Sequence, residues 1–229
     1  MIRRPRRIQV RGARSYSPGM AEVSDPLPIV LLTGFGPFPG VSNNASADVV
    51  RGVSRLAFRT FPEVRFVTAI LPTEWRRAPR LVADLHQNLR PALALHFGVA
   101  SGTSSIRLET KARNVCRPSL DAAGALPLAE MLCDGPDARP VTIDVPAIAG
   151  SLKAGGWPCS LSDDAGGYLC NAVLYQSLSE ADALGNCKVG FVHIPAELSG
   201  PLSPDNVVAA AAEILNTAVR AVAAGTNPA

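Results

Sequence analysis

The chain has 229 residues, 47% hydrophobic and 18% charged, an ordinary globular composition that is long enough for one large domain with a buried core. Its net charge of +3 comes from residues 1–19, which contain six arginines and no acidic residue; without that segment the net charge is −3. Because the rest of the chain is mildly acidic, its charge gives no support to nucleic-acid binding. The longest apolar stretch, residues 207–224, contains Glu213, Asn216 and Arg220, so we expect an Ala-rich helix of a soluble domain and no membrane span.

The N-terminal arginines are interrupted by Pro5, Gly12 and Pro18 and form no clear amphipathic helix. The segment has no apolar stretch of the kind found in secretory signals, so secretion is not expected. A transit peptide, a disordered tail and an upstream extension of a chain that starts at Met20 all fit this composition, and we favour the last two. We therefore predict that residues 1–27 form a basic, disordered extension and that residues 28–229 form the functional domain.

The cysteines and histidines restrict the chemistry further. The five cysteines include no C-x-x-C pair, and an odd number in a chain of this length does not resemble a disulfide framework. These features predict a reducing, cytoplasmic environment. With three histidines the chain cannot build a His-rich metal centre, so we expect no zinc site.

The first half of the chain alternates between strand and helix patterns. Residues 29–33 are a continuous apolar run that predicts a central parallel strand, and Ser46 is the expected N-cap of a helix through residues 49–56. Residues 64–70 and 92–97 predict further strands, separated by a helix over residues 74–89 with His86 on its exposed side. Residues 106–112 predict one strand, followed by hairpins and loops in the Pro- and Gly-rich segment 118–140.

The alternation returns in the second half. We predict helices at residues 147–154, 170–184 and 204–224, the last capped by Ser203, and strands at residues 159–161 and 189–194. Repeated strand–helix–strand units indicate a single three-layer α/β/α domain with a mostly parallel, mixed central sheet. Sites in such sheets collect beyond the carboxyl ends of the strands. Residues 34–38, residues 98–102 and His193 are predicted to meet there.

A cysteine and a histidine carry the strongest chemical signal. Cys170 follows a Gly-Gly turn at the start of a predicted helix, and His193 follows 23 residues later at the end of an apolar strand. A neighbouring imidazole and a helix N-terminus both favour the nucleophilic thiolate. Each residue alone is more often a core residue, but their combination makes a cysteine hydrolase the leading hypothesis.

Four sequence motifs together resemble those of the pyroglutamyl peptidase I (pyrrolidone-carboxylate peptidase) family. Thr33-Gly34-Phe35-Gly36-Pro37-Phe38, followed by Asn44-Ala45-Ser46, is similar to the family's opening motif. The block from His96 to Asn114 is similar to its catalytic-glutamate motif. The segments 165–171 and 190–195 resemble its cysteine and histidine motifs. The matches are in order and span roughly residues 29–195.

The resemblance implies a cofactor-free α/β/α cysteine exopeptidase with the triad Glu109, Cys170 and His193. It implies hydrolysis of the amide after an N-terminal pyroglutamyl residue, through a thioester on the cysteine. Peptides or small amides are the implied partners, and the family suggests a homotetramer. Phe35 and Phe38 match aromatics that sandwich the lactam ring, and Asn44 matches a residue that orders this pocket. Arg117 is the nearest equivalent of a family arginine that stabilises the oxyanion, if a short deletion follows Asn114.

The chain departs from the family at several positions near this pocket. Thr103 stands where arginine is common, Ala45 where proline is common, and Tyr168 where phenylalanine is common; Val99 replaces a glutamine found in some members. These departures leave two other hypotheses about the function open. One is a related cysteine amidohydrolase with a different acyl-group specificity, and the other is a non-catalytic homologue that binds a ligand or senses redox state.

Overall fold

A computed structural model of the chain describes residues 27–185 and 187–225. Residues 1–26, on which most of the predicted basic extension falls, lie outside the described residues. The elements in chain order are β1 (Ile29–Phe35), α1 (Ala45–Thr60), β2 (Arg65–Leu71), α2 (Arg77–Leu89), β3 (Leu93–Ala100), β4 (Ile106–Glu109), β5 (Lys111–Arg113), β6 (Ala138–Pro140), α3 (Val145–Ala154), β7 (Cys159–Ser162), α4 (Leu169–Leu184), β8 (Lys188–Pro195), the short 3₁₀ helix η1 (Gly200–Leu202) and α5 (Pro204–Gly225).

A six-stranded sheet in the order β2-β1-β3-β8-β4-β7 forms the centre of the fold. The pairs β2-β1, β1-β3 and β3-β8 are parallel, β8-β4 is antiparallel, and β4-β7 is again parallel. β5 and β6 form a separate antiparallel pair. The strands β1, β3 and β8 are almost completely buried, which explains why their sequences read as continuous apolar runs. The predicted mostly parallel, mixed sheet is confirmed.

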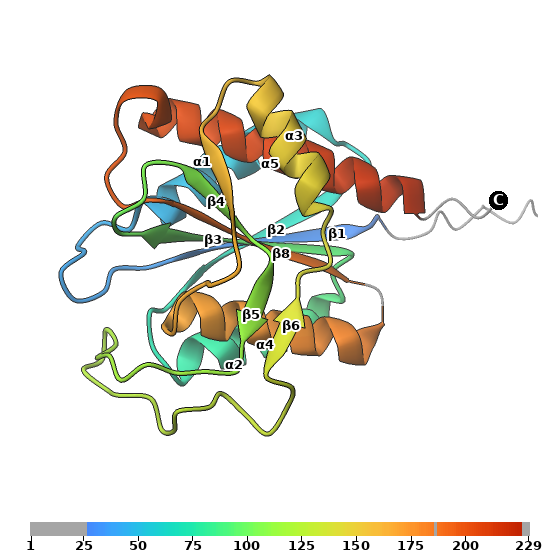
Figure 1. Cartoon of the computed structure of the whole chain (residues 1–229). Coiled ribbons are helices and arrows are strands. Elements are labelled where there is room, and N and C mark those ends of the chain that lie inside the picture. The colour runs from blue at the N-terminus through green and yellow to red at the C-terminus, as the bar shows by residue number, and fades with distance from the viewer. Residues whose placement is uncertain (1–26, 186, 226–229) are drawn as a thin grey trace, which may run out of the picture.

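Helices cover both faces of the sheet, as Figure 1 shows: α1, α3 and α5 lie on one side, and α2 and α4 lie on the other. One core cluster fills each side. Within the described residues, α5 is the single helix whose length and hydropathy would also suit a membrane span. Its buried residues pack into the core against α1 and α3, and they include Val207, Ala211, Ile214 and Leu215.

Two local predictions are wrong for reasons of tertiary structure. The strand predicted over residues 106–112 is divided at Thr110, because β4 stays in the main sheet while β5 leaves it to pair with β6. The N-cap of α1 is Asn44, whose side chain accepts a hydrogen bond from the backbone N–H of Ser46. Ser46 is instead inside the helix, where its hydroxyl accepts a hydrogen bond from the backbone N–H of Phe35. This bond ties the start of α1 to the end of β1.

The close approach of β1 and α1 also requires Gly34. A Cβ at this position would lie 2.6 Å from the carbonyl oxygen of Ser46. Figure 1 shows that the segments following β1, β3 and β8 emerge at the same edge of the sheet, and this edge carries the predicted site residues.

Candidate active site

The first turn of α4 carries Cys170 as its second residue. The loop before it is held by Asp164, whose carboxylate accepts a hydrogen bond from the N–H of Gly166, a glycine with φ of 82°. The buried Asn171 also holds the start of α4 in place, through the segment of residues 113–115. Its amide oxygen accepts a bond from the N–H of Arg113, and its amide nitrogen donates to the carbonyls of Arg113 and Val115. Cys170 therefore sits on a turn held by hydrogen bonds on both sides, at the N-terminus of α4.

The thiol lies directly over a glycine of β3. A Cβ at Gly98 would lie 2.8 Å from Sγ of Cys170 and 2.9 Å from Cζ of Phe191. Gly98 and His193 are register partners across the parallel pair β3-β8, so their side-chain positions are on the same face of the sheet. The absent side chain at position 98 provides the space that Cys170 occupies beside His193.

His193 is connected to an acid on the neighbouring strand. Its Nδ1 is 2.8 Å from Oε1 of Glu109, and the two side chains are 6% and 0% exposed. Burial by itself lowers the pKa of His193, but its charge interaction and hydrogen bond with Cys170, together with those to Glu109, outweigh burial and raise this pKa to about 9. The arrangement therefore stabilises the protonated imidazole of His193.

Arg107 completes this group, and the sequence patterns did not identify it. Its guanidinium lies 3.4 Å from Oε1 of Glu109 and donates to the hydroxyl of Ser162 at 2.6 Å and to the carbonyl of Asp164 at 2.9 Å. Arg107 thus connects the buried acid to the loop that precedes Cys170. Two-residue spacing on β4 places Arg107 and Glu109 on the same face, which is the signal that was available in the sequence. Oε2 of Glu109 has no hydrogen-bond partner among the described residues.

Two aromatic side chains lie near the thiol. Tyr168, two residues before Cys170, has its ring centroid 6.2 Å from that of Phe38, and both side chains are half-buried. Asn44 donates from its side-chain amide to the carbonyl of Gly36 and so fixes the loop that carries Phe38. Phe35 is 2% exposed and packs against Phe191 in the core, with ring centroids 6.4 Å apart. The structure therefore leaves Phe38 and Tyr168 partly accessible, whereas Phe35 is a core residue, and lactam binding by Phe35 and Phe38 stays a prediction.

Comparisons with known proteins cover most of the chain. Residues 29–229 match the family model described as "Pyroglutamyl peptidase". The chain belongs to the pyroglutamyl peptidase family. It is 34% identical over 173 residues to the pyrrolidone-carboxylate peptidase of Cupriavidus taiwanensis, covering 74% of this chain and 79% of that protein. The pyrrolidone-carboxylate peptidase of Vibrio vulnificus is 36% identical over 170 residues, covering 72% of this chain and 77% of that protein.

Solved structures of pyroglutamyl peptidases have the same fold. The crystal structure of Bacillus amyloliquefaciens pyroglutamyl peptidase I superposes with a TM-score of 0.75 at 28% identity, covering 84% of this chain and 97% of that one. The pyrrolidone carboxyl peptidase of Fervidobacterium islandicum gives a TM-score of 0.73 at 32% identity, covering 82% and 96%. The protein is therefore a cysteine peptidase with the α/β/α fold of this family.

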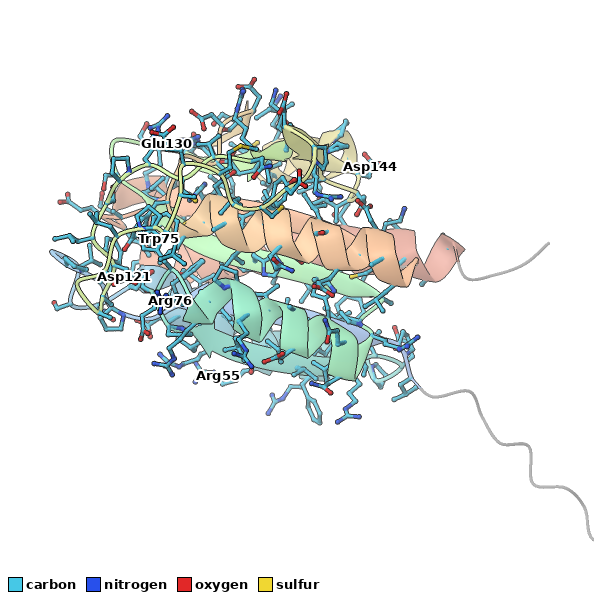
Figure 2. All side chains as sticks on the ribbon, turned by 90° about the horizontal axis from the view of Figure 1, so that it is seen from below. Arg55, Trp75, Arg76, Asp121, Glu130 and Asp144 are labelled. Carbon is cyan, nitrogen blue, oxygen red and sulfur yellow. The ribbon has the colours of Figure 1, made fainter. Side chains whose placement is uncertain are left out.

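Two further loops of the peptidase contact Tyr168. The hydroxyl of Tyr168 donates to the carbonyl of Leu120, and Trp75 packs edge-on against the Tyr168 ring at 5.2 Å between centroids. Asp121, 2% exposed, accepts hydrogen bonds from the backbone N–H groups of Trp75, Ala123 and Ala125. Figure 2 shows Trp75 and Asp121 close together on this side of the peptidase.

Arg117 lies next to the loop before Cys170, with its guanidinium directed away from the fold. Its backbone N–H donates to the carbonyl of Gly167, and its side chain passes so close that a Cβ on Gly167 would be 2.4 Å from Cγ of Arg117. The guanidinium is 3.7 Å from the Asp164 carboxylate, and the side chain is 67% exposed. Its role as an oxyanion donor stays a prediction, as do the catalytic roles of Glu109, Cys170 and His193.

A buried polar chain supports α4 beneath the site. Nε2 of His96 and Nε2 of His86 are each 2.8 Å from the hydroxyl of Ser177, and Nδ1 of His96 is 2.7 Å from the hydroxyl of Thr33. Burial lowers the pKa of His86 to about 4 and that of His96 to about 3, so both rings are neutral. The prediction that His86 is exposed is wrong. His86 is four residues after the buried Val82 and lies on the same side of α2, facing α4.

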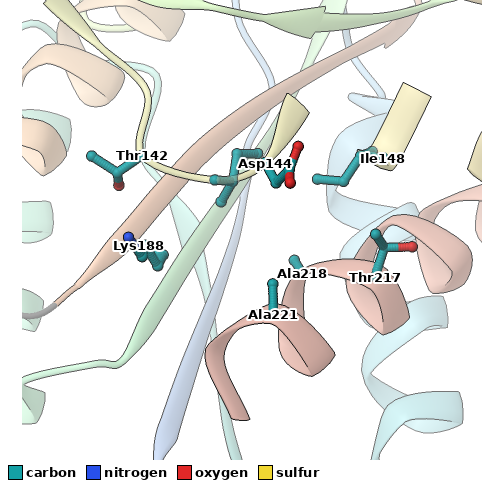
Figure 3. Close-up of a pocket in the computed structure, with 8 residues that line it drawn as sticks. Thr142, Asp144, Ile148, Lys188, Thr217, Ala218 and Ala221 are labelled. Atoms are coloured by element: carbon teal, nitrogen blue, oxygen red, sulfur yellow. The ribbon is translucent and has the colours of Figure 1, made fainter. Parts of the chain in front are cut away.

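One hollow of the peptidase lies away from this site. This hollow, shown in Figure 3, measures about 220 Å³ and is lined by Thr142, Asp144, Ile148 and Lys188, with Thr217 and Ala218 of α5. Lys188 begins β8, five residues before His193, so this hollow is at the opposite edge of the sheet. Its position gives it no access to Cys170.

Proposed function

We propose that this peptidase removes an N-terminal pyroglutamyl residue from peptides through a thioester on Cys170. The observation that carries the proposal is the placement of the thiol over Gly98 and beside the His193–Glu109 pair, near the Phe38–Tyr168 ring pair. In this proposal the acyl recess lies at that ring pair. A flat, uncharged lactam suits a recess between aromatic rings.

The reaction starts from the thiolate of Cys170 and the imidazolium of His193. The thiolate attacks the acyl carbonyl carbon and forms a tetrahedral intermediate, whose oxyanion the backbone N–H at the start of α4 stabilises. His193 then gives its proton to the leaving amine, the C–N bond breaks, and the acyl group remains as a thioester. Water attacks the thioester with His193 as the base, which releases pyroglutamate and restores the thiol.

Glu109 and Asn44 position the reacting groups in this scheme. Glu109 holds the His193 ring through Nδ1, so the other ring nitrogen faces the thiol and the leaving amine. Asn44 and Thr73 both donate to the carbonyl of Gly36, which keeps the Phe38 loop in place against the lactam. The Arg117 guanidinium reaches the oxyanion in this proposal by exchanging its exposed contact with Asp164 for one with bound substrate.

The proposed setting is a reducing cytoplasm, with short or blocked peptides as substrates and a homotetramer as the assembly. All five cysteines are free thiols, and the mechanism needs Cys170 reduced. Size-exclusion chromatography with light scattering tests the assembly.

The decisive experiment compares fluorescent amides of pyroglutamate, proline and glutamate, with Cys170→Ala and a matched Cys159→Ala control. Cys159 is also a half-buried free thiol, on the edge strand β7. We expect pyroglutamyl-selective turnover that is lost in Cys170→Ala and kept in Cys159→Ala, and a pyroglutamyl mass increment on Cys170 after rapid quenching. Turnover of another acyl amide in preference would indicate a related amidohydrolase. No turnover by folded, reduced protein would support the non-catalytic alternative.

A further inference from the structure

A second hollow opens at the carboxyl edge of the sheet, between the segments that follow β3 and β8. It measures about 540 Å³ and is lined by residues 101–104 on one side and by most of residues 195–202 on the other. This volume is within the range of roughly 300–1,000 Å³ that is usual for ligand sites. None of the residues assigned above to the triad or the acyl recess lines it.

The strand order sets the position of this hollow relative to the catalytic groups. Phe38 follows β1, the thiol of Cys170 lies over Gly98 on β3, and His193 is on β8; β1, β3 and β8 are consecutive in the sheet. The acyl recess is therefore on the β1 side of the thiol, and His193 is on the other side. The register pair Ala100–Pro195 lies one step beyond Gly98–His193, about 7 Å further toward the carboxyl edge, and Pro195 already lines the hollow.

The position of the hollow can be compared with the place where the leaving peptide must lie. The leaving amine must be next to His193 to receive its proton, so the peptide that follows the scissile bond extends past His193 and away from the acyl recess. The hollow begins just beyond His193, at the carboxyl ends of β3 and β8, within reach of this peptide.

The charges around the hollow favour a cation. Glu197 is its one charged lining residue; it is exposed and forms no ion pair or hydrogen bond with any residue that the structure describes. The other lining groups are hydroxyls, backbone and small apolar side chains. The nearby start of α5 carries the positive end of a helix dipole, but Asp205 in its first turn offsets this partial charge.

We propose that this hollow binds the leaving peptide and that Glu197 selects peptides with lysine or arginine at the first or second position after pyroglutamate. The inference rests on the proposed function and extends it to the part of the substrate that leaves. Since Glu197 is exposed, its preference is modest, roughly 2- to 5-fold in kcat/KM for a cationic over a neutral residue, and it weakens with added salt.

The test compares pyroglutamyl-lysyl, pyroglutamyl-alanyl and pyroglutamyl-glutamyl peptide amides, with product release followed by chromatography at low and high salt. The variants are Glu197→Gln, Glu197→Lys and the control Glu63→Lys. Glu63 is an exposed glutamate just before β2, at the opposite edge of the sheet. We expect Glu197→Gln to remove the preference for lysine and Glu197→Lys to reverse it, mainly through KM, with a combined change in the lysine-to-glutamate ratio of roughly 5- to 20-fold. The control retains the wild-type ratio.

A pyroglutamyl fluorescent amide, which carries no peptide beyond the scissile bond, distinguishes failure of the leaving-peptide site from failure of the proposed function. It is cleaved at the wild-type rate by every variant if the inference is correct. Equal kcat/KM for all three peptides in the wild type, or a ratio that changes as much in Glu63→Lys as in Glu197→Lys, would overturn the leaving-peptide site while leaving the proposed function intact. Absence of cleavage of every pyroglutamyl compound would overturn both.

Discussion

Gly98→Ala tests whether the space over β3 is what allows the thiol to reach its reactive position. The new methyl carbon would lie 2.8 Å from Sγ of Cys170 and 2.9 Å from Cζ of Phe191. Non-bonded heavy atoms pack at about 3.5–4.0 Å, so both neighbours would be too close by roughly 1 Å and both contacts must be relieved. The Phe191 ring is fully buried between strands and helix α4, whereas the thiol is the free end of a short side chain. The thiol therefore moves.

The expected consequence is a larger loss of activity than of stability. A displacement of about 1 Å between reacting groups costs roughly 100-fold in rate, which corresponds to about 2.7 kcal/mol of activation free energy. Overpacking a strand position of this kind lowers the free energy of unfolding by roughly 1–3 kcal/mol. The measurements are kcat/KM on a pyroglutamyl amide, the rate of Cys170 alkylation, and thermal unfolding.

Gly150→Ala is the matched control for this substitution. Gly150 is inside α3, has no atom within 4 Å of a built Cβ, and does not have a positive φ. Alanine there should leave kcat/KM unchanged and raise stability by up to about 1 kcal/mol, because alanine favours helix. Wild-type kcat/KM and alkylation rate in folded Gly98→Ala would refute the argument that this glycine positions the thiol.

Three further substitutions test the electrostatics and the support of the site. Glu109→Gln should lower kcat by about 10⁴-fold, as loss of the equivalent acid does in a Ser-His-Asp triad. The raised pKa of His193 means that its imidazolium is lost as pH rises through about 9, and removing the Glu109 charge lowers that pKa, so the alkaline limb of kcat/KM should move to lower pH in this variant. Arg107→Gln removes a positive charge from beside Glu109, so the same limb should move to higher pH by roughly half a unit, and Arg107→Lys should restore it. Ser177→Ala leaves two buried imidazole nitrogens without their partner and should lower the free energy of unfolding by roughly 2–4 kcal/mol in denaturant titrations.

The direction of each pH effect provides the check. An alkaline limb that stays near pH 9 in Glu109→Gln would show that the carboxylate does not stabilise the imidazolium. An unshifted limb in Arg107→Gln would reduce Arg107 to a purely structural contact with the loop before Cys170. For the two histidines bonded to Ser177, the folded pKa values of about 4 and 3 are below the unfolded value. The contribution of these two neutral histidines to the free energy of unfolding is thus complete above about pH 6.5. That free energy should fall toward pH 4 by about 1.4 kcal/mol per pH unit for each histidine. Unchanged stability of Ser177→Ala would contradict the role of the buried polar chain.

The sequence by itself determined the architecture and the main chemical hypothesis. Apolar runs such as residues 29–33 and the helical spacing after Cys170 follow from local backbone geometry, so strand–helix alternation and the α/β/α class could be predicted. The ordered motifs around Glu109, Cys170 and His193 predicted membership of the pyroglutamyl peptidase family, and the comparisons confirm it.

Only the tertiary structure decided the arrangement of groups that are distant in the chain. Glu109 and His193 are 84 residues apart, and their 2.8 Å contact depends on β4 lying antiparallel to β8, which no local pattern specifies. The same is true of Arg107 beside the acid and of His86 packed against Ser177. The spacing of residues along a helix or strand shows which of them lie on the same side of that element. What packs against that side is set by the free energy of burying the whole core, in which the contributions of all elements are coupled.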